Sequence, residues 1–183
     1  MLSELQRKNI SSVFDVLDTD GSGVITRADF VAVVTRLKSA LHHPEGSPQA
    51  QSLSDGYLGW WEQIRKQVDV DEDGRITRDE YIDAVDQGLL EDSHYLDAVS
   101  AAADSLFGAA DADGDGALVE SEMVVVYGSV GIDPGIAAGA FHQIDADGDG
   151  RISRAELRAA VRGAFASKGP QEPGSNILGN ANG

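Results

Sequence analysis

A twelve-residue pattern of acidic residues and glycine occurs four times in this chain and restricts its fold more than any other feature. In residues 69–80, 111–122 and 145–156 it has acids at positions one, three, five and twelve, glycine at six and an aliphatic residue at eight. Residues 18–29 depart from it once, because Ser22 stands at position five. These segments hold 18 of the 31 Asp and Glu residues. Because clustered carboxylates repel one another, the pattern predicts four cation sites.

The residue types and their spacing match the EF-hand calcium loop. Short side chains at positions one, three and five turn their oxygens toward one point, and glycine at six permits the sharp bend. Position seven contributes its carbonyl, position nine acts through a water, and the acid at twelve completes a shell of about seven oxygens. Ordinary Asp-Gly turns are the alternative. A chance match to the full pattern is expected about 0.005 times in a chain of this composition, so that alternative stays open only for the first loop.

Each loop supplies its own set of predicted ligands, and the residue at position seven acts through its backbone oxygen. The predicted ligands are Asp18, Asp20, Ser22, Val24, Thr26 and Asp29 in the first loop; Asp69, Asp71, Asp73, Arg75, Thr77 and Glu80 in the second; Asp111, Asp113, Asp115, Ala117 and Glu122 in the third; and Asp145, Asp147, Asp149, Arg151, Ser153 and Glu156 in the fourth.

The four loops are not equivalent as calcium sites. The second and fourth carry four acidic ligands and a hydroxyl at position nine, whereas the third has Val119 there. The first has Ser22 at position five and Asp29, one methylene shorter than Glu, at position twelve. A bidentate grip is harder for Asp, so six-coordinate Mg²⁺ competes better at this loop. We expect up to four bound Ca²⁺, with Mg²⁺ competing above all at residues 18–29.

Apolar residues at helical spacing flank every loop, which predicts eight helices. Ser47-Pro48 and Asp133-Pro134 are typical of a helix N-cap followed by proline at the first helical position. The predicted fold is all-α, with four helix–loop–helix units in two pairs that pack as one compact globule. The predicted divisions are an N-terminal pair (residues 1–90), a C-terminal pair (residues 91–168) and a non-helical tail (residues 169–183).

Charge and composition exclude several classes of partner. A net charge of −17 and a pI near 4.3 are the wrong sign for binding nucleic acid or an anionic membrane. The absence of cysteine excludes disulfides and thiolate metal sites. No secretion signal or membrane-spanning run is present, so we expect a cytoplasmic monomer. The four histidines accompany no candidate nucleophile, so no enzymatic activity is expected.

Four such loops, a long first interval, Trp60-Trp61 before the second loop and a tail rich in Pro, Gly and Asn resemble the sarcoplasmic calcium-binding protein and calerythrin family. Successive loops begin 51, 42 and 34 residues apart. The resemblance implies a compact globule that binds calcium tightly as an intracellular buffer or carrier. Members often have one degenerate loop, whereas no loop here is plainly inactive. An excess of Arg over Lys, 10 to 4, resembles a GC-rich, actinobacterial source.

The sequence leaves three alternatives open. A calcium sensor, which regulates a target protein in calcium signalling, commonly exposes a Met-rich groove, and this chain has only Met1 and Met123. Buffering is therefore favoured, but a single-target sensor needs no Met. Coelenterazine photoproteins share the scaffold, and Trp60-Trp61 are suited to line an aromatic cavity. The tail is either disordered or folds back so that Ile177-Leu178 fill an apolar groove.

Overall fold

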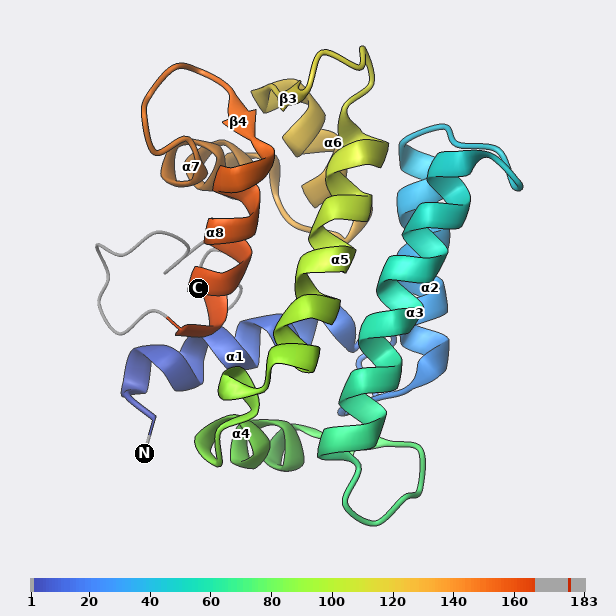
Figure 1. The fold of residues 1–183 in the computed structure, drawn as a ribbon, viewed down its shortest axis with the longest axis vertical. Helices are drawn as coiled ribbons and strands as arrows, with labels where there is room; N and C mark the ends of the chain where they lie inside the picture. The colour runs from blue at the N-terminus through green and yellow to red at the C-terminus, as the bar shows by residue number, and fades with distance from the viewer. Residues whose placement is uncertain (1, 167–177, 179–183) are drawn as a thin grey trace.

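The computed structural model describes residues 2–166 and residue 178 of the 183-residue chain. Helices account for most of the described chain, and short strands join the loops between them (Figure 1). The elements are α1 (Glu4–Leu17), β1 (Val24–Ile25), α2 (Arg27–Ala40), α3 (Pro48–Val68), β2 (Ile76–Thr77), α4 (Arg78–Asp86), the 3₁₀ turn η1 (Leu89–Glu91), α5 (Ser93–Ala110), β3 (Ala117–Leu118), α6 (Glu120–Ser129), α7 (Pro134–Ile144), β4 (Ile152–Ser153) and α8 (Arg154–Ala166). The predicted all-α globule with eight helices is confirmed.

The helix starts follow from local hydrogen bonding. The Ser47 hydroxyl accepts a hydrogen bond from the amide of Ala50, and Pro48 is the first residue of α3. Asp133 caps α7 in the same way through the amide of Gly135, with Pro134 at the first helical position. Both predicted starts are confirmed. Proline fits there because the first helical amide has no partner inside the helix.

The strands join the loops into two antiparallel pairs. In the β1–β2 pair, Ile25 lies opposite Ile76, and in the β3–β4 pair, Leu118 lies opposite Ile152. These residues stand at position eight of the four loops, and all are fully buried. Each loop is therefore held beside one other loop by backbone hydrogen bonds and a buried aliphatic contact.

Aromatic residues join the two halves of the chain. The Phe30 ring lies 5.5 Å from Trp60 and 5.6 Å from Trp61, measured between centroids. Trp60 also meets Phe165 of α8 edge-on, and its indole N–H donates to the Tyr95 hydroxyl at 3.3 Å. Because Trp60 belongs to α3, whereas Tyr95 and Phe165 belong to α5 and α8, these contacts hold the halves together as one globule (Figure 1).

Helices α3 and α5 cross closely where Gly56 faces α5. A Cβ atom on Gly56 would lie 2.6 Å from the Ser105 hydroxyl and 3.1 Å from the Ala101 carbonyl oxygen. A second link comes from the α2–α3 connection, where His43 Nε2 lies 2.7 Å from the Ala109 carbonyl oxygen. His43 is thus half-buried, although its place beside a proline suggests a surface loop.

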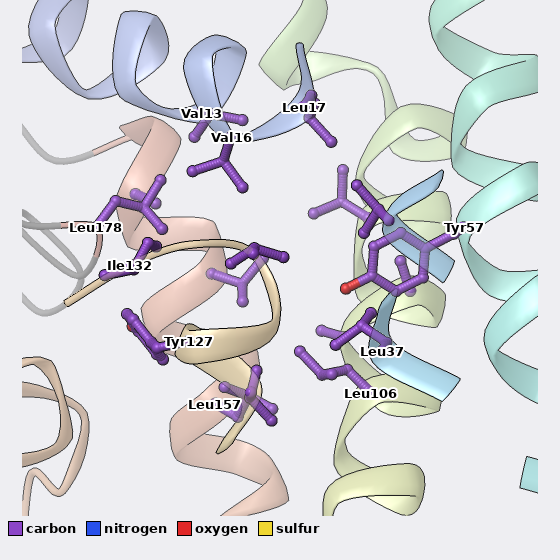
Figure 2. A pocket seen from close by; sticks show the side chains of 18 of the residues that line it. Val13, Val16, Leu17, Leu37, Tyr57, Leu106, Tyr127, Ile132, Leu157 and Leu178 are labelled. Carbon is purple, nitrogen blue, oxygen red and sulfur yellow. The ribbon is translucent and has the colours of Figure 1, made fainter. Parts of the chain in front are cut away.

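An apolar cavity of about 160 Å³ lies between the halves (Figure 2). Leu17, Leu37, Leu106 and Leu157 line it, and Leu178 lies at one side. Leu178 is thus partly buried against the core, and the rest of the predicted tail lies outside the described residues. No described helix combines the length and apolar composition that a bilayer span requires.

Candidate metal centres

Backbone amides organise the first half of every loop. The carboxylate at position one accepts hydrogen bonds from the amides of positions five and six. In the first loop, Asp18 accepts from Ser22 at 3.0 Å and from Gly23 at 2.8 Å. The glycine at position six has φ between 77° and 85° in all four loops, a conformation that residues with a Cβ adopt at a cost. The loop backbone thereby directs these carboxylates inward.

The carboxylate at position twelve closes three of the loops. One of its oxygens accepts the amide of position nine, the N-cap of the exiting helix, and the other accepts the amide of position two. The position-two bonds run from Thr19 to Asp29 (3.1 Å), from Ala112 to Glu122 (2.9 Å) and from Ala146 to Glu156 (3.0 Å). One side chain thus starts the exiting helix and also faces the acids of the loop.

Each loop brings three carboxylates close enough to share one ion. Their ligand atoms lie within 4.8 Å of one another. Oxygens that bind one Ca²⁺ at about 2.4 Å are separated by at most about 4.8 Å, and the ion prefers hard oxygen ligands, so these groups fit calcium. The groups are Asp18, Asp20 and Asp29; Asp69, Asp71 and Asp73; Asp111, Asp113 and Glu122; and Asp145, Asp147 and Glu156. Glu80, Asp115 and Asp149 stand outside them.

In the first loop, Asp29 lies with the other acids despite its short side chain, and it is 3% exposed. Thr19 and Thr26 each donate an amide and a hydroxyl hydrogen to one oxygen of Asp29. The Ser22 hydroxyl donates to the Val24 carbonyl oxygen at 3.1 Å, so the predicted ligands at positions five and seven of this loop contact each other. This loop therefore holds a ligand set that is small but well ordered.

The second loop differs in ways that position-by-position matching missed. Glu80 accepts the amide and hydroxyl of Thr77 through one oxygen, but no bond joins its other oxygen to the Val70 amide. Position four carries Glu72 at a φ of 58°, where the other three loops have glycine. A residue with a Cβ in that conformation costs on the order of 1 kcal/mol. The change from glycine at position four was the available signal in the sequence.

In the third loop, Asp115 is engaged by a residue of the neighbouring loop. The Arg151 guanidinium forms an ion pair with it, and this pair holds the pKa of Asp115 below its usual value. Asp115 also accepts the Ala117 amide at 3.0 Å. Val119 adds only its amide, which donates to Glu122, so position nine lacks the hydroxyl that Thr26, Thr77 and Ser153 provide.

In the fourth loop, hydrogen bonds hold the acids at positions one, five and twelve. Ser153 donates its amide at 2.8 Å and its hydroxyl at 2.7 Å to Glu156. These bonds, the amide first, lower the pKa of Glu156, which keeps it ionised for a cation. Asp145 accepts three backbone amides and is buried. Asp149 turns to the Arg151 amide at 2.8 Å, as Asp73 turns to Arg75 in the second loop.

The central cavity does not have the lining expected for a photoprotein. Figure 2 shows the Tyr57 ring and its hydroxyl reaching from α3 into a space lined mostly by aliphatic side chains, with Tyr127 also among the lining residues. Burial raises the pKa of Tyr57 far above its usual value, so the hydroxyl stays neutral. None of the described residues that line the cavity is a histidine. Trp60 lines it, whereas Trp61 does not.

Comparison with known proteins agrees with this geometry. A model of an EF-hand domain pair matches residues 7–86, and an EF-hand model matches residues 136–161, so the third loop lies outside both matched segments. Calerythrin from Saccharopolyspora erythraea is 26% identical over 164 residues, which cover 88% of this chain and 93% of that protein.

Two solved structures share the fold. A Streptomyces coelicolor calcium-binding protein superposes with a TM-score of 0.79 at 27% identity, over 87% of this chain and 97% of that one. A sarcoplasmic calcium-binding protein from amphioxus superposes with a TM-score of 0.77 at 18% identity, over 98% of each chain.

Proposed function

Because this chain is an EF-hand calcium-binding protein, similar in sequence to calerythrin and in fold to a sarcoplasmic calcium-binding protein, we propose that it is a cytoplasmic calcium buffer. Its relatives bind calcium and are not enzymes, and this chain is likewise a binding protein. It carries candidate loops for up to four ions.

The proposed ligands are the 23 residues predicted from the four loops, including those that bind through the carbonyl at position seven. The proposed pairs are residues 1–90 and 91–168, in keeping with the pairing of β1 with β2 and of β3 with β4. Mg²⁺ competes for the same hard oxygen ligands, and we propose that it does so best at the first loop. We also propose that the protein acts as a monomer.

The observation that favours a buffer is the burial of the apolar helix faces. The halves bury these faces against each other, with Phe30, Trp60 and Phe165 at the junction. Among the described residues, the exposed large apolar side chains are Val31, Val70, Val119 and Val125, which belong to four different elements or loops. A sensor presents a continuous apolar groove to its target, and scattered valines do not form one.

A calcium sensor is the second candidate. The structure of the Streptomyces coelicolor protein is described as a basis for prokaryotic calcium-mediated regulation, and that protein is 27% identical to this chain over most of its length. A sensor role would require the junction between the halves to open when calcium binds, because the apolar surface is otherwise covered.

The two roles are separated by a calcium titration of the chelated protein in about 1 mM Mg²⁺, the competing ion. An apolar-surface dye and intrinsic Trp fluorescence are followed together, since Trp60 and Trp61 lie at or beside the junction. For a buffer, dye binding falls or stays flat as calcium is added. A rise in dye binding that follows calcium occupancy would establish the sensor instead.

A matched control variant assigns the response to the loops. Asp29→Asn, Glu80→Gln, Glu122→Gln and Glu156→Gln together remove the position-twelve charges while keeping the size of each side chain. Calcium should change neither signal in this variant. A response that persists there would show that the calcium response does not depend on the position-twelve carboxylates.

A further inference from the structure

Two arginines form matching bridges across the two pairs of helix–loop–helix units. Arg78 and Arg154 stand at position ten of the second and fourth loops, as the first residues of α4 and α8. Each side chain leaves its own unit and contacts the entering helix of the partner unit. The side chains of Arg27 and Glu120, at position ten of the other two loops, form no hydrogen bond or ion pair with the described residues.

In the N-terminal pair, Arg78 binds α1 in three ways. Its guanidinium carbon lies 4.4 Å from the centroid of the Phe14 ring. One nitrogen donates to the Ser11 carbonyl oxygen at 3.0 Å, and another forms an ion pair with Asp15. Stacking, a backbone hydrogen bond and charge pairing together use the flat, forked shape of the guanidinium.

In the C-terminal pair, Arg154 repeats these contacts on α5. Its guanidinium carbon lies 4.4 Å from the centroid of Phe107, and it donates to the Asp104 carbonyl oxygen at 3.0 Å. It forms an ion pair with the Asp104 carboxylate at 3.7 Å, and the same carboxylate also pairs with Arg158. The aromatic partner stands four residues, and the carbonyl partner seven residues, before the loop in both pairs.

The position of each arginine relates it to two ligands. Arg78 stands two residues before Glu80, the position-twelve ligand of the second loop. Its partner Phe14 stands four residues before Asp18, the position-one ligand of the first loop, and its carbonyl oxygen accepts a hydrogen bond from the Asp18 amide. A shift of α4 that brings Glu80 onto an ion is therefore transmitted to the segment that positions Asp18.

We propose that Arg78 and Arg154 are positioning residues that couple the two calcium sites of each pair. The β1–β2 and β3–β4 strands join the loops at position eight, and the arginine bridges add a second connection, between the exiting helix of one unit and the entering helix of the other. With two connections the helices shift together. Filling one site therefore favours the ligand geometry of its neighbour.

The test measures coupling in the full-length protein with the C-terminal sites disabled by Glu122→Gln and Glu156→Gln. The amide of Gly74, which donates to Asp69, reports occupancy of the second loop by NMR. In this background, Asp29→Asn disables the first loop. We expect this change to weaken calcium binding at the second loop by at least about fivefold, the lower end of typical coupling between sites.

The same comparison is then made with Arg78→Ala. The effect of Asp29→Asn on the second loop should shrink to less than about twofold, since the remaining connection is the strand pair. Arg65→Ala is the control, because among the described residues the ion pair of Arg65 is with Glu62 on its own helix, α3. That variant should keep the full effect. Arg78→Lys retains the charge without the forked geometry, and it should lie between the two.

A fivefold effect that survives in Arg78→Ala would overturn the proposal and leave Arg78 a purely structural residue. Absence of coupling in the parent would overturn it as well, while calcium binding itself would still be seen at Gly74. If Arg78→Ala does not fold, Arg78→Lys and the equivalent Arg154 variants in the C-terminal pair decide the question. Gly116 and Gly150, whose amides donate to Asp111 and Asp145, are the reporters there.

Discussion

Arg75 and Arg151 occupy the same position, seven, in the second and fourth loops, but their side chains behave differently. Arg151 pairs with Asp115 of the third loop. The residue of the first loop at the position equivalent to Asp115 is Ser22, and the Arg75 guanidinium forms no ion pair with the described residues. A guanidinium on Asp115 competes with an ion for that carboxylate.

We therefore predict that Arg151→Gln raises the calcium affinity of the third loop. The increase should be about two- to fivefold, as expected for removal of an exposed ion pair. Arg75→Gln carries the same change in charge and should leave the first loop within about twofold. NMR titrations followed at Gly116 and Gly23 measure the two effects. Equal gains in both variants would mean that net charge alone is responsible.

Asp29 offers a test of ion selectivity. Asp29→Glu adds the methylene that the position-twelve side chains of the other three loops already have. A longer carboxylate grips Ca²⁺ with both oxygens and disfavours the small octahedral shell of Mg²⁺. We predict a severalfold gain in calcium preference at this loop in a Ca²⁺/Mg²⁺ competition, whereas an unchanged preference would remove Asp29 as its cause.

The positions of the candidate ligands can be read from the sequence, but the hydrogen bonds and ion pairs of these side chains within each loop cannot. The spacing alone identifies Asp18, Asp145 and their equivalents, because a short loop allows few arrangements of its own residues. The diversion of Asp115 depends on a side chain 36 residues away in sequence. The incomplete closure of the second loop at Glu80 likewise depends on backbone geometry that residue types do not specify.

At the level of the helices, the close approach of α3 to α5 at Gly56 should make the stability of the protein sensitive to a larger side chain there. Gly56→Ala places a methyl group against Ser105 and the Ala101 carbonyl, so it should lower the free energy of unfolding by about 1–2 kcal/mol. Gly59→Ala on the same helix is the control, because a Cβ there meets nothing within 4 Å. That variant should be stabilised by up to about 1 kcal/mol, the helix-propensity difference.

Denaturant unfolding measures both variants. Ser105→Ala removes the atom that a Cβ on Gly56 would approach most closely, so it should recover part of the loss in the double variant. Destabilisation of the same size in Gly56→Ala and Gly59→Ala would show that the contact between α3 and α5 does not require glycine at position 56.

Helix positions and starts followed from apolar spacing and capping residues, because these are local properties. The approach of α3 to α5 was not predictable in the same way. A glycine inside a helical pattern signals weak helix propensity, and nothing local shows that Gly56 faces α5 while Gly59 meets open space. The same holds for Trp60 and Trp61, whose partners lie on other helices.

For the whole molecule, the role of Leu178 at one side of the central cavity can be tested by substitution. Leu178 lines this cavity although it follows α8 by twelve residues. We predict that Leu178→Asp increases binding of an apolar-surface dye, because a carboxylate is excluded from that surface. Leu178→Met keeps the apolar volume and should behave as the parent. Equal dye binding by both variants would show that Leu178 does not close the cavity.

The packing of the two pairs of helix–loop–helix units into one globule was predictable from the sequence, whereas the cavity was not. Its lining comes from seven helices, the connection between α6 and α7, and Leu178, so it depends on how all of them meet. The charge of the whole chain was available from composition alone. The calcium-free protein has a net charge of −17, and the acids gathered in four loops repel one another strongly. Binding four Ca²⁺ changes the net charge to −9.

We expect the energy of calcium binding at these four loops to stabilise the fold. The melting temperature of the full-length protein in excess calcium and in chelator tests this stabilisation. We predict that calcium raises it by more than about 10 °C, since each filled site adds free energy to the folded state alone. The variant that lacks all four position-twelve charges should show little of this rise. Equal melting of the parent protein in calcium and in chelator would contradict the account.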